Sequence, residues 1–268
     1  MSIEVRNLSK RFVKYENNKG FIKNVYSYFS PKRNYKYALR DLSFKINDGE
    51  IVGYLGKNGA GKSTTIKILS GIMKADDGIC LVDDRTPWIN RKEHVQTIGV
   101  VFGQKSNLWW DLPVIDSFNL LNAIYKIPKS SYEKNLSYLA KELDIIKLLD
   151  QPVRTLSLGQ RMRCEIAASL LHSPKILFLD EPTIGLDALS KKKVRAFIKK
   201  LNKTQNTTII LTTHDTQDLE ALVDRILFID EGKILFDGTI PELKLFSGDQ
   251  NQSLDDILIG LYQMSGDD

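Results

Sequence analysis

Gly56-Lys57-Asn58-Gly59-Ala60-Gly61-Lys62-Ser63 is the stretch of sequence that decides the fold. It follows a short apolar run, Ile51–Leu55, and leads into a helical pattern that extends to about Leu69. A strand, a glycine-rich loop and a helix in this order, with Lys-Ser at the end of the loop, form a phosphate-binding P-loop. Glycines let backbone N–H groups converge on phosphate oxygens, and the helix N-terminus adds partial positive charge.

Eight positions are therefore expected to contact a nucleotide: Gly56, Asn58, Gly59, Ala60, Gly61, Lys62, Ser63 and Thr64. Lys62 should reach the β- and γ-phosphates, and the Ser63 hydroxyl should ligate Mg²⁺. The alternative is a chance glycine-rich turn. The full spacing in the right context argues against it.

A second apolar run, Ile176–Leu179, ends in the adjacent carboxylates Asp180 and Glu181. Ligands of open α/β sheets bind at the carboxyl ends of the strands, where this pair would lie. Asp180 would hold Mg²⁺, and Glu181 would polarise an attacking water as general base. By itself the pair could equally be an ordinary end of a strand; the P-loop upstream favours the catalytic interpretation.

With Leu156-Ser157-Leu158-Gly159-Gln160 between them, these stretches resemble the ATP-binding cassette (ABC) family over nearly the whole chain. The resemblance implies ATP and Mg²⁺ as ligands. It also implies that Ser157, Gly159 and Gln160 form a signature that binds the ATP of a partner subunit. Leu158 departs from the family, which usually has glycine there. We expect its side chain to alter the contact with the partner subunit's ATP without abolishing that contact or hydrolysis.

The resemblance assigns further roles along the chain. It implies that Gln104 is the Q-loop glutamine that senses Mg²⁺ and water, that Asp187 belongs to the D-loop at a dimer interface, and that His214 is the switch histidine that contacts the γ-phosphate. For the aromatic ring that stacks on adenine, Phe12 is at the expected position. Tyr15 and Tyr37 are alternatives, because any π-face can stack.

The predicted fold class is α/β: a P-loop NTPase core with a mainly parallel sheet flanked by helices, an antiparallel β subdomain and an inserted helical subdomain. We expect one domain over residues 1–268, which contains a basic and aromatic insert (13–37), the helical subdomain (106–172) and a C-terminal helical tail (240–268). Phe21–Phe29 could form a short helix, and Asn47–Gly49 is typical of a hairpin turn.

The composition excludes several classes of protein. The 268 residues are 42% hydrophobic and 26% charged, and no apolar run approaches the roughly 20 residues that span a bilayer. Cys80 and Cys164 are too few for a disulfide framework and suit small buried side chains. The net charge of +5 is mild, and we expect no nucleic-acid partner.

The expected partners are a second ATP-binding subunit, in a homodimer, and two ABC-2-type transmembrane permease subunits that hold the chain at the cytoplasmic face of the cell membrane. The segment before Tyr37–Asp41 resembles that of ABC-2-type exporter ATPases, and Trp109 and Trp110 suit either a contact with a membrane subunit or the core. The insert could equally be a solvated hairpin. Three alternatives stay open: a soluble ABC ATPase that acts on ribosomes or DNA, a regulatory cassette without hydrolysis, and import.

Overall fold

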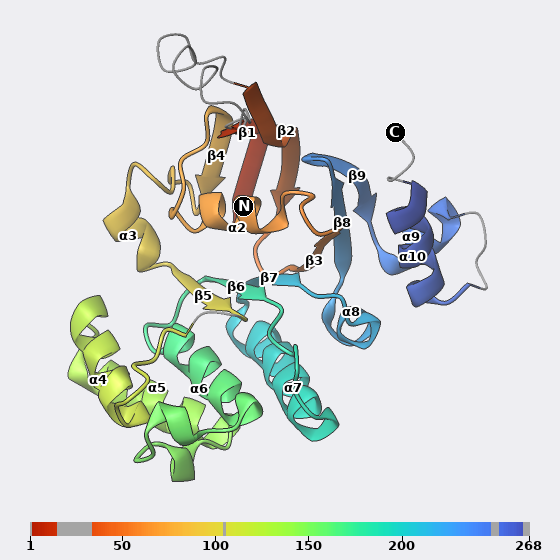
Figure 1. Ribbon diagram of the computed structural model, residues 1–268. Helices are drawn as coiled ribbons and strands as arrows, with labels where there is room; N and C mark the ends of the chain where they lie inside the picture. The colour runs from red at the N-terminus through yellow and green to blue at the C-terminus, as the bar shows by residue number, and fades with distance from the viewer. Residues whose placement is uncertain (1, 15–33, 104–105, 248–251, 265–268) are drawn as a thin grey trace, which may run out of the picture.

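A six-stranded sheet crosses the middle of the molecule (Figure 1). The computed structural model describes residues 2–14, 34–103, 106–247 and 252–264. The strand order is β5-β6-β7-β3-β8-β9, parallel except for the antiparallel pair at the β9 edge. The strands are β3 (Ile51–Gly56), β5 (Ile98–Phe102), β6 (Ile176–Asp180), β7 (Thr208–Thr212), β8 (Arg225–Asp230) and β9 (Lys233–Gly238).

Both faces of this sheet are covered, which explains why its central strands are apolar throughout. Every residue of β3 is buried. Ile51 and Leu55 point into one hydrophobic cluster, and Val52 and Tyr54 point into a second cluster on the opposite face. The predicted mainly parallel sheet flanked by helices is confirmed, and the P-loop follows its central strand.

A separate three-stranded antiparallel sheet lies above the first (Figure 1). Its order is β2-β1-β4, with β1 at Ile3–Lys14, β2 at Asn34–Ile46 and β4 at Asp77–Val82. The predicted hairpin at Asn47–Gly49 is wrong, because β2 pairs with β1 while β3 joins the parallel sheet. The turn instead links two sheets: β2 has alternating burial along its second half, whereas β3 is apolar on both faces.

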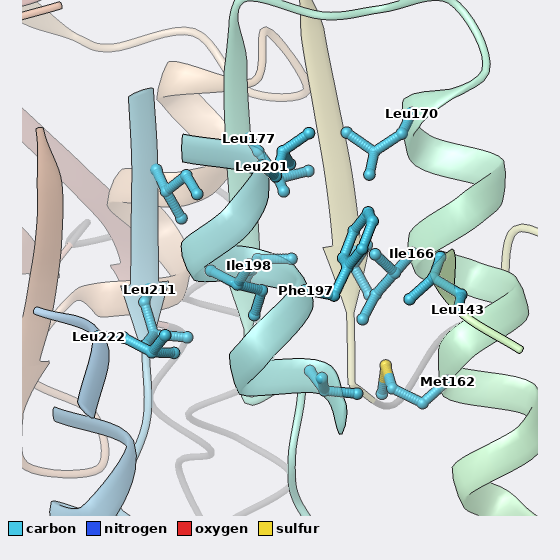
Figure 2. Packing of buried hydrophobic residues seen from close by; sticks show 14 of the residues in the cluster. Leu143, Met162, Ile166, Leu170, Leu177, Phe197, Ile198, Leu201, Leu211 and Leu222 are labelled. Carbon is cyan, nitrogen blue, oxygen red and sulfur yellow. The ribbon is translucent and has the colours of Figure 1, made fainter. Parts of the chain in front are cut away.

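The described helices cover the two faces of the large sheet. Leu177 of β6, Ile166 of α6 and Phe197 of α7 belong to one buried cluster, part of which Figure 2 shows. The helices are α2 (Lys62–Leu69), α3 (Arg91–Val95), α4 (Val114–Tyr125), α5 (Lys129–Glu142), α6 (Leu158–Leu170), α7 (Ala188–Gln205), α8 (Thr216–Leu222), α9 (Ile240–Phe246) and α10 (Leu254–Met264), with 3₁₀ turns at Ile146–Leu148 and Val153–Thr155.

The regions expected from the sequence can now be placed. Residues 106–172 contain α4, α5 and α6, and the tail from 240 contains α9 and α10; both contribute to the same buried cluster as the parallel sheet. Of the 13–37 insert, only its ends are described, as the last residues of β1 and the first of β2. The possible helix Phe21–Phe29 lies outside the described residues. Within the described part of the chain, no helix combines the length and apolar character that crossing a membrane requires.

Candidate functional site

The P-loop connects β3 to α2, and its backbone passes close to other chain segments. Gly61 has φ +114°, and a Cβ there would lie 2.6 Å from the carbonyl oxygen of Ala38, so glycine is required on both grounds. The Lys62 ammonium folds over the loop and donates to the carbonyl oxygens of Gly56 and, at 3.0 Å, Lys57. Burial lowers the pKa of Lys62, while the charges of Glu181 and Asp180 oppose that shift. The lysine therefore lies within electrostatic reach of both carboxylates.

A cavity of about 600 Å³, which we call the P-loop pocket, joins the loop to the carboxylate pair. Its wall also includes Ile72 and the segments on either side of residues 104–105. Expected site residues at its lining are Gly59, Gly61, Asn58, Lys62, Ser63, Thr64, Asp180 and Glu181. Two others, Gly56 and Ala60, are buried in the loop beneath them. Gln104 lies outside the described residues.

The carboxylate pair is held by the neighbouring strand. Asp180 and Thr212 are register partners across β6 and β7, and the Thr212 hydroxyl donates to Asp180 Oδ1 at 2.5 Å. Glu181 comes next with φ +53°, and its N–H donates to the Thr212 carbonyl oxygen at 3.0 Å. Both carboxylates line the P-loop pocket. Motif reasoning missed Thr212, because only the strand register places it beside Asp180.

His214 follows β7 and lies beside the general-base candidate. Its Nε2 is 3.4 Å from Glu181 Oε1, and its side chain is partly exposed. The ring of Tyr262 on α10 lies 6.5 Å from the His214 ring. The other two histidines contact backbone carbonyl oxygens: Nε2 of His94 is 2.8 Å from that of Leu69, and Nε2 of His172 is 2.9 Å from that of Ile98.

The signature segment begins α6, away from the lining of the P-loop pocket. Ser157 is the N-cap: its hydroxyl accepts from the Gln160 N–H at 3.2 Å, and the Gln160 side chain accepts from the Ser157 N–H at 2.8 Å. This capping box satisfies two helix N–H groups. Gly159 is buried, and a Cβ there would lie 2.6 Å from the Ser190 hydroxyl of α7.

Gly185 and Asp187, in the segment expected to form the D-loop, pack against this segment. Asp187 is the N-cap of α7, with its carboxylate accepting from the Ser190 N–H at 3.0 Å and the Ser190 hydroxyl at 2.6 Å. A Cβ on Gly185 would lie 2.7 Å from Leu158 Cδ2. Leu158, the departure from the expected glycine, therefore contacts the D-loop of its own chain.

The adenine candidates lie on opposite faces of the β1–β2 pair. Phe12 is register partner to Lys36, and Tyr37 is partner to Arg11. Phe12 is 43% exposed and lines neither the P-loop pocket nor the polar cavity of about 510 Å³ that Tyr37 and Arg40 border. Tyr37 precedes Ala38, whose carbonyl oxygen lies against Gly61 of the P-loop. Tyr15 lies outside the described residues.

Known proteins resemble this chain in sequence and in fold. The family described as ABC transporter matches residues 39–184. The ABC transporter ATP-binding protein NatA of Bacillus subtilis is 31% identical over 215 residues, which cover 80% of this chain and 87% of NatA. The energy-coupling factor transporter ATP-binding protein EcfA1 of Oenococcus oeni is 34% identical over 241 residues, covering 86% and 84%. The dimeric post-hydrolysis structure of the ATP-binding cassette MJ0796, bound to ADP and Pi, gives a TM-score of 0.73 at 25% identity, covering 89% and 98%.

Proposed function

The chain belongs to the ABC transporter family, and from its membership we propose that this ATP-binding ATPase drives an ABC-2-type exporter as a dimer beneath two membrane subunits. The P-loop pocket carries the proposal. One cavity joins a P-loop lysine, a hydroxyl and two carboxylates, which together can cradle a triphosphate and activate water against it.

The residues of the pocket suit ATP with Mg²⁺. Mg²⁺ in such sites is bound by one or two protein oxygens together with substrate phosphates and water. Ser63 and Asp180 line the same pocket, so their oxygens would hold the ion, which would offset charge on the phosphate oxygens. Lys62 would exchange its two carbonyl partners for phosphate oxygens. For Gln104, metal sensing stays a proposal from the family resemblance.

Glu181 is the proposed general base. Its carboxylate lines the pocket, and its Oε1 lies 3.4 Å from His214 Nε2. The histidine can therefore hold one carboxylate oxygen while the other orients a water. A general base needs this hydrogen-bond reach to the proton it accepts. His214 is absent from the lining of the P-loop pocket but shares a neighbouring cavity with Glu181, and its proposed contact with the γ-phosphate would be made from there.

The dimer is proposed from the position of the signature. Ser157, Gly159 and Gln160 lie apart from the lining of the P-loop pocket in their own chain, so a nucleotide for them would come from a second copy. Asp187 would cross the same interface. The dimeric MJ0796 structure supports this arrangement. ATP held between the two copies would close the dimer, and hydrolysis would reopen it.

Exposed apolar side chains on the helical region suit the proposed membrane partner. Trp109 and Trp110 are 41% and 52% exposed, and Leu120 and Ile124 of α4 are exposed as well. Exposed tryptophans of this kind anchor protein contacts. We propose that a helix of a membrane subunit docks here and holds the chain at the cytoplasmic face of the membrane.

The direction of transport has a second candidate. Export is proposed from the resemblance to ABC-2-type exporter ATPases. EcfA1 belongs to an energy-coupling factor transporter, so import is the alternative. Reconstitution of the chain with its membrane subunits in vesicles would show on which side substrate accumulates when ATP is supplied outside.

The dimer and the general base are tested together by Glu181→Gln. The amide keeps the shape of the side chain but cannot accept a proton, so ATP should stay bound and trap a dimer. Light scattering should report twice the monomer mass with ATP and the monomer mass without it. Lys62→Ala, which weakens phosphate binding, is the control and should stay monomeric. Persistent monomer of Glu181→Gln at saturating ATP would contradict the scheme.

A further inference from the structure

Glu165 is a buried carboxylate that no expected role explains. It lies on α6, eight residues after Ser157, and is 4% exposed. One carboxylate oxygen accepts from the Ser106 hydroxyl, and the other accepts from the Asn107 N–H at 2.9 Å. Burial raises the pKa of Glu165, and these hydrogen bonds oppose the shift. A carboxylate is costly to bury, so its partners should matter.

The partners of Glu165 form part of the P-loop pocket. Ser106 and Asn107 line it in the same cavity as Lys62 and Glu181. The Asn107 side chain also donates to the Val100 carbonyl oxygen at 3.0 Å. This wall is therefore tied to β5 on one side and to α6 on the other.

Helix α6 connects that wall to the signature. Glu165 lies seven positions, about 10 Å along the helix, after Leu158 at the start of α6. Met162 and Ile166, on either side of Glu165 in the sequence, are buried in the core, so the helix is held firmly against the sheet. A shift of α6 would therefore reach the pocket wall through the Glu165 carboxylate.

We propose that Glu165 is a positioning residue for ATP turnover: its carboxylate fixes the Ser106–Asn107 wall of the P-loop pocket relative to α6 without touching the nucleotide. The inference rests on the proposed function of the pocket. It adds a link inside one chain between the helix that the signature begins and the wall of that chain's own nucleotide site.

Glutamine is the conservative replacement for Glu165, because it can keep both hydrogen bonds. In Glu165→Gln, the amide oxygen can accept from the Asn107 N–H while the amide NH₂ donates to the Ser106 hydroxyl. That hydroxyl can still donate to the Leu108 carbonyl oxygen, which lies 3.2 Å away. Glutamine therefore preserves both contacts, whereas alanine removes both and leaves a gap at the wall.

The test measures kcat and KM for ATP hydrolysis by the whole chain. Glu165→Ala should lower kcat by about 10- to 100-fold, the range expected when a small displacement spoils alignment, with KM for ATP changed less than about threefold. Glu165→Gln should keep kcat within about threefold of wild type. Ser106→Ala should lower kcat, and adding it to Glu165→Ala should cost little more, because Glu165→Ala already removes the Ser106–Glu165 hydrogen bond.

Cys164→Ala is the matched control for lost stability. Cys164 is the neighbour of Glu165 on α6, fully buried in the core and absent from the pocket lining. It should keep wild-type kcat even if it lowers the melting temperature. Wild-type kcat in Glu165→Ala, or an equal loss in Cys164→Ala, would overturn the inference. If Lys62→Ala kept the ATPase activity of the wild type, that result would instead contradict the proposed function of the pocket.

Discussion

Thr212 shows at the scale of single residues how the pocket depends on groups outside its motifs. Its side chain is buried, its hydroxyl donates to Asp180 Oδ1, and the same oxygen lies 3.2 Å from the Glu181 nitrogen as an acceptor. One hydroxyl thus fixes the carboxylate proposed to hold Mg²⁺ and the backbone of the proposed base.

Replacing Thr212 by valine should test this role. Valine has nearly the same shape but no hydroxyl, so Asp180 would lose its donor and the Glu181 N–H one of its acceptors. We expect a loss of about 1–3 kcal/mol in the free energy of unfolding and a higher Mg²⁺ concentration for half-maximal ATPase activity. Thr212→Ser keeps the hydroxyl and should behave close to wild type in a Mg²⁺ titration. Identical titrations for valine and wild type would rule out the role.

At the scale of elements, the contact between α6 and the D-loop follows from the unusual Leu158. Gly185 has φ +67°, where a side chain costs about 1–2 kcal/mol, and a Cβ would also lie 2.7 Å from Leu158 Cδ2. Gly185→Ala should therefore lower the free energy of unfolding by about that backbone cost, with a small further part because the exposed end of Leu158 has to move aside. Adding Leu158→Ala should restore the part that is due to the clash.

Urea denaturation of the two single variants and the double variant measures that coupling. Leu158 is partly exposed, so Leu158→Ala by itself should have a small effect. If the double variant were as unstable as the sum of the two single changes, the contact would not restrain the D-loop. ATPase rates of the same variants would then show whether Leu158 tunes turnover through this contact.

The elements that sequence patterns predicted are those with strong local signals. The end of α2 at Leu69 matches the helical pattern that follows the P-loop, and β6 matches the apolar run that ends at Asp180. Strand β4 was missed, because half of its residues are exposed and its sequence includes Asp77 and Gly78. Asn47–Gly49 was misread as a hairpin, since turn residues do not say which sheet the next strand joins.

The residues of the candidate site also divide into those that local sequence predicts and those that it does not. Lys62, Asp180 and Glu181 could be predicted because each is next to a glycine loop or at the end of an apolar strand. Thr212 and Glu165 could not, because their partners come from strand register and from a helix that packs across the sheet. Long-range packing also decides what Leu158 touches, and no local spacing encodes that contact.

At the scale of the whole molecule, one hydrophobic cluster joins three regions that are separate in the sequence. It includes Val114 and Leu139 of the helical region, Leu177 of the parallel sheet and Leu258 of α10. In Figure 1, α10 lies on the opposite side of the molecule from α4. Because these regions share a core, the described chain should lose its structure as one cooperative unit.

Leu258→Ala tests whether the C-terminal helix is part of that unit. Leu258 is 4% exposed, so its truncation should cost about 2–5 kcal/mol, while Ile259→Ala on the exposed side of the same helix should change stability by less than about 0.5 kcal/mol. Hydrogen exchange should then report a similar loss of protection in α6 and β6, since the most protected amides open only in global unfolding. Unchanged protection in α6 beside a destabilised α10 would mean that the helical region unfolds separately, and that the shared core does not couple the tail to the nucleotide site.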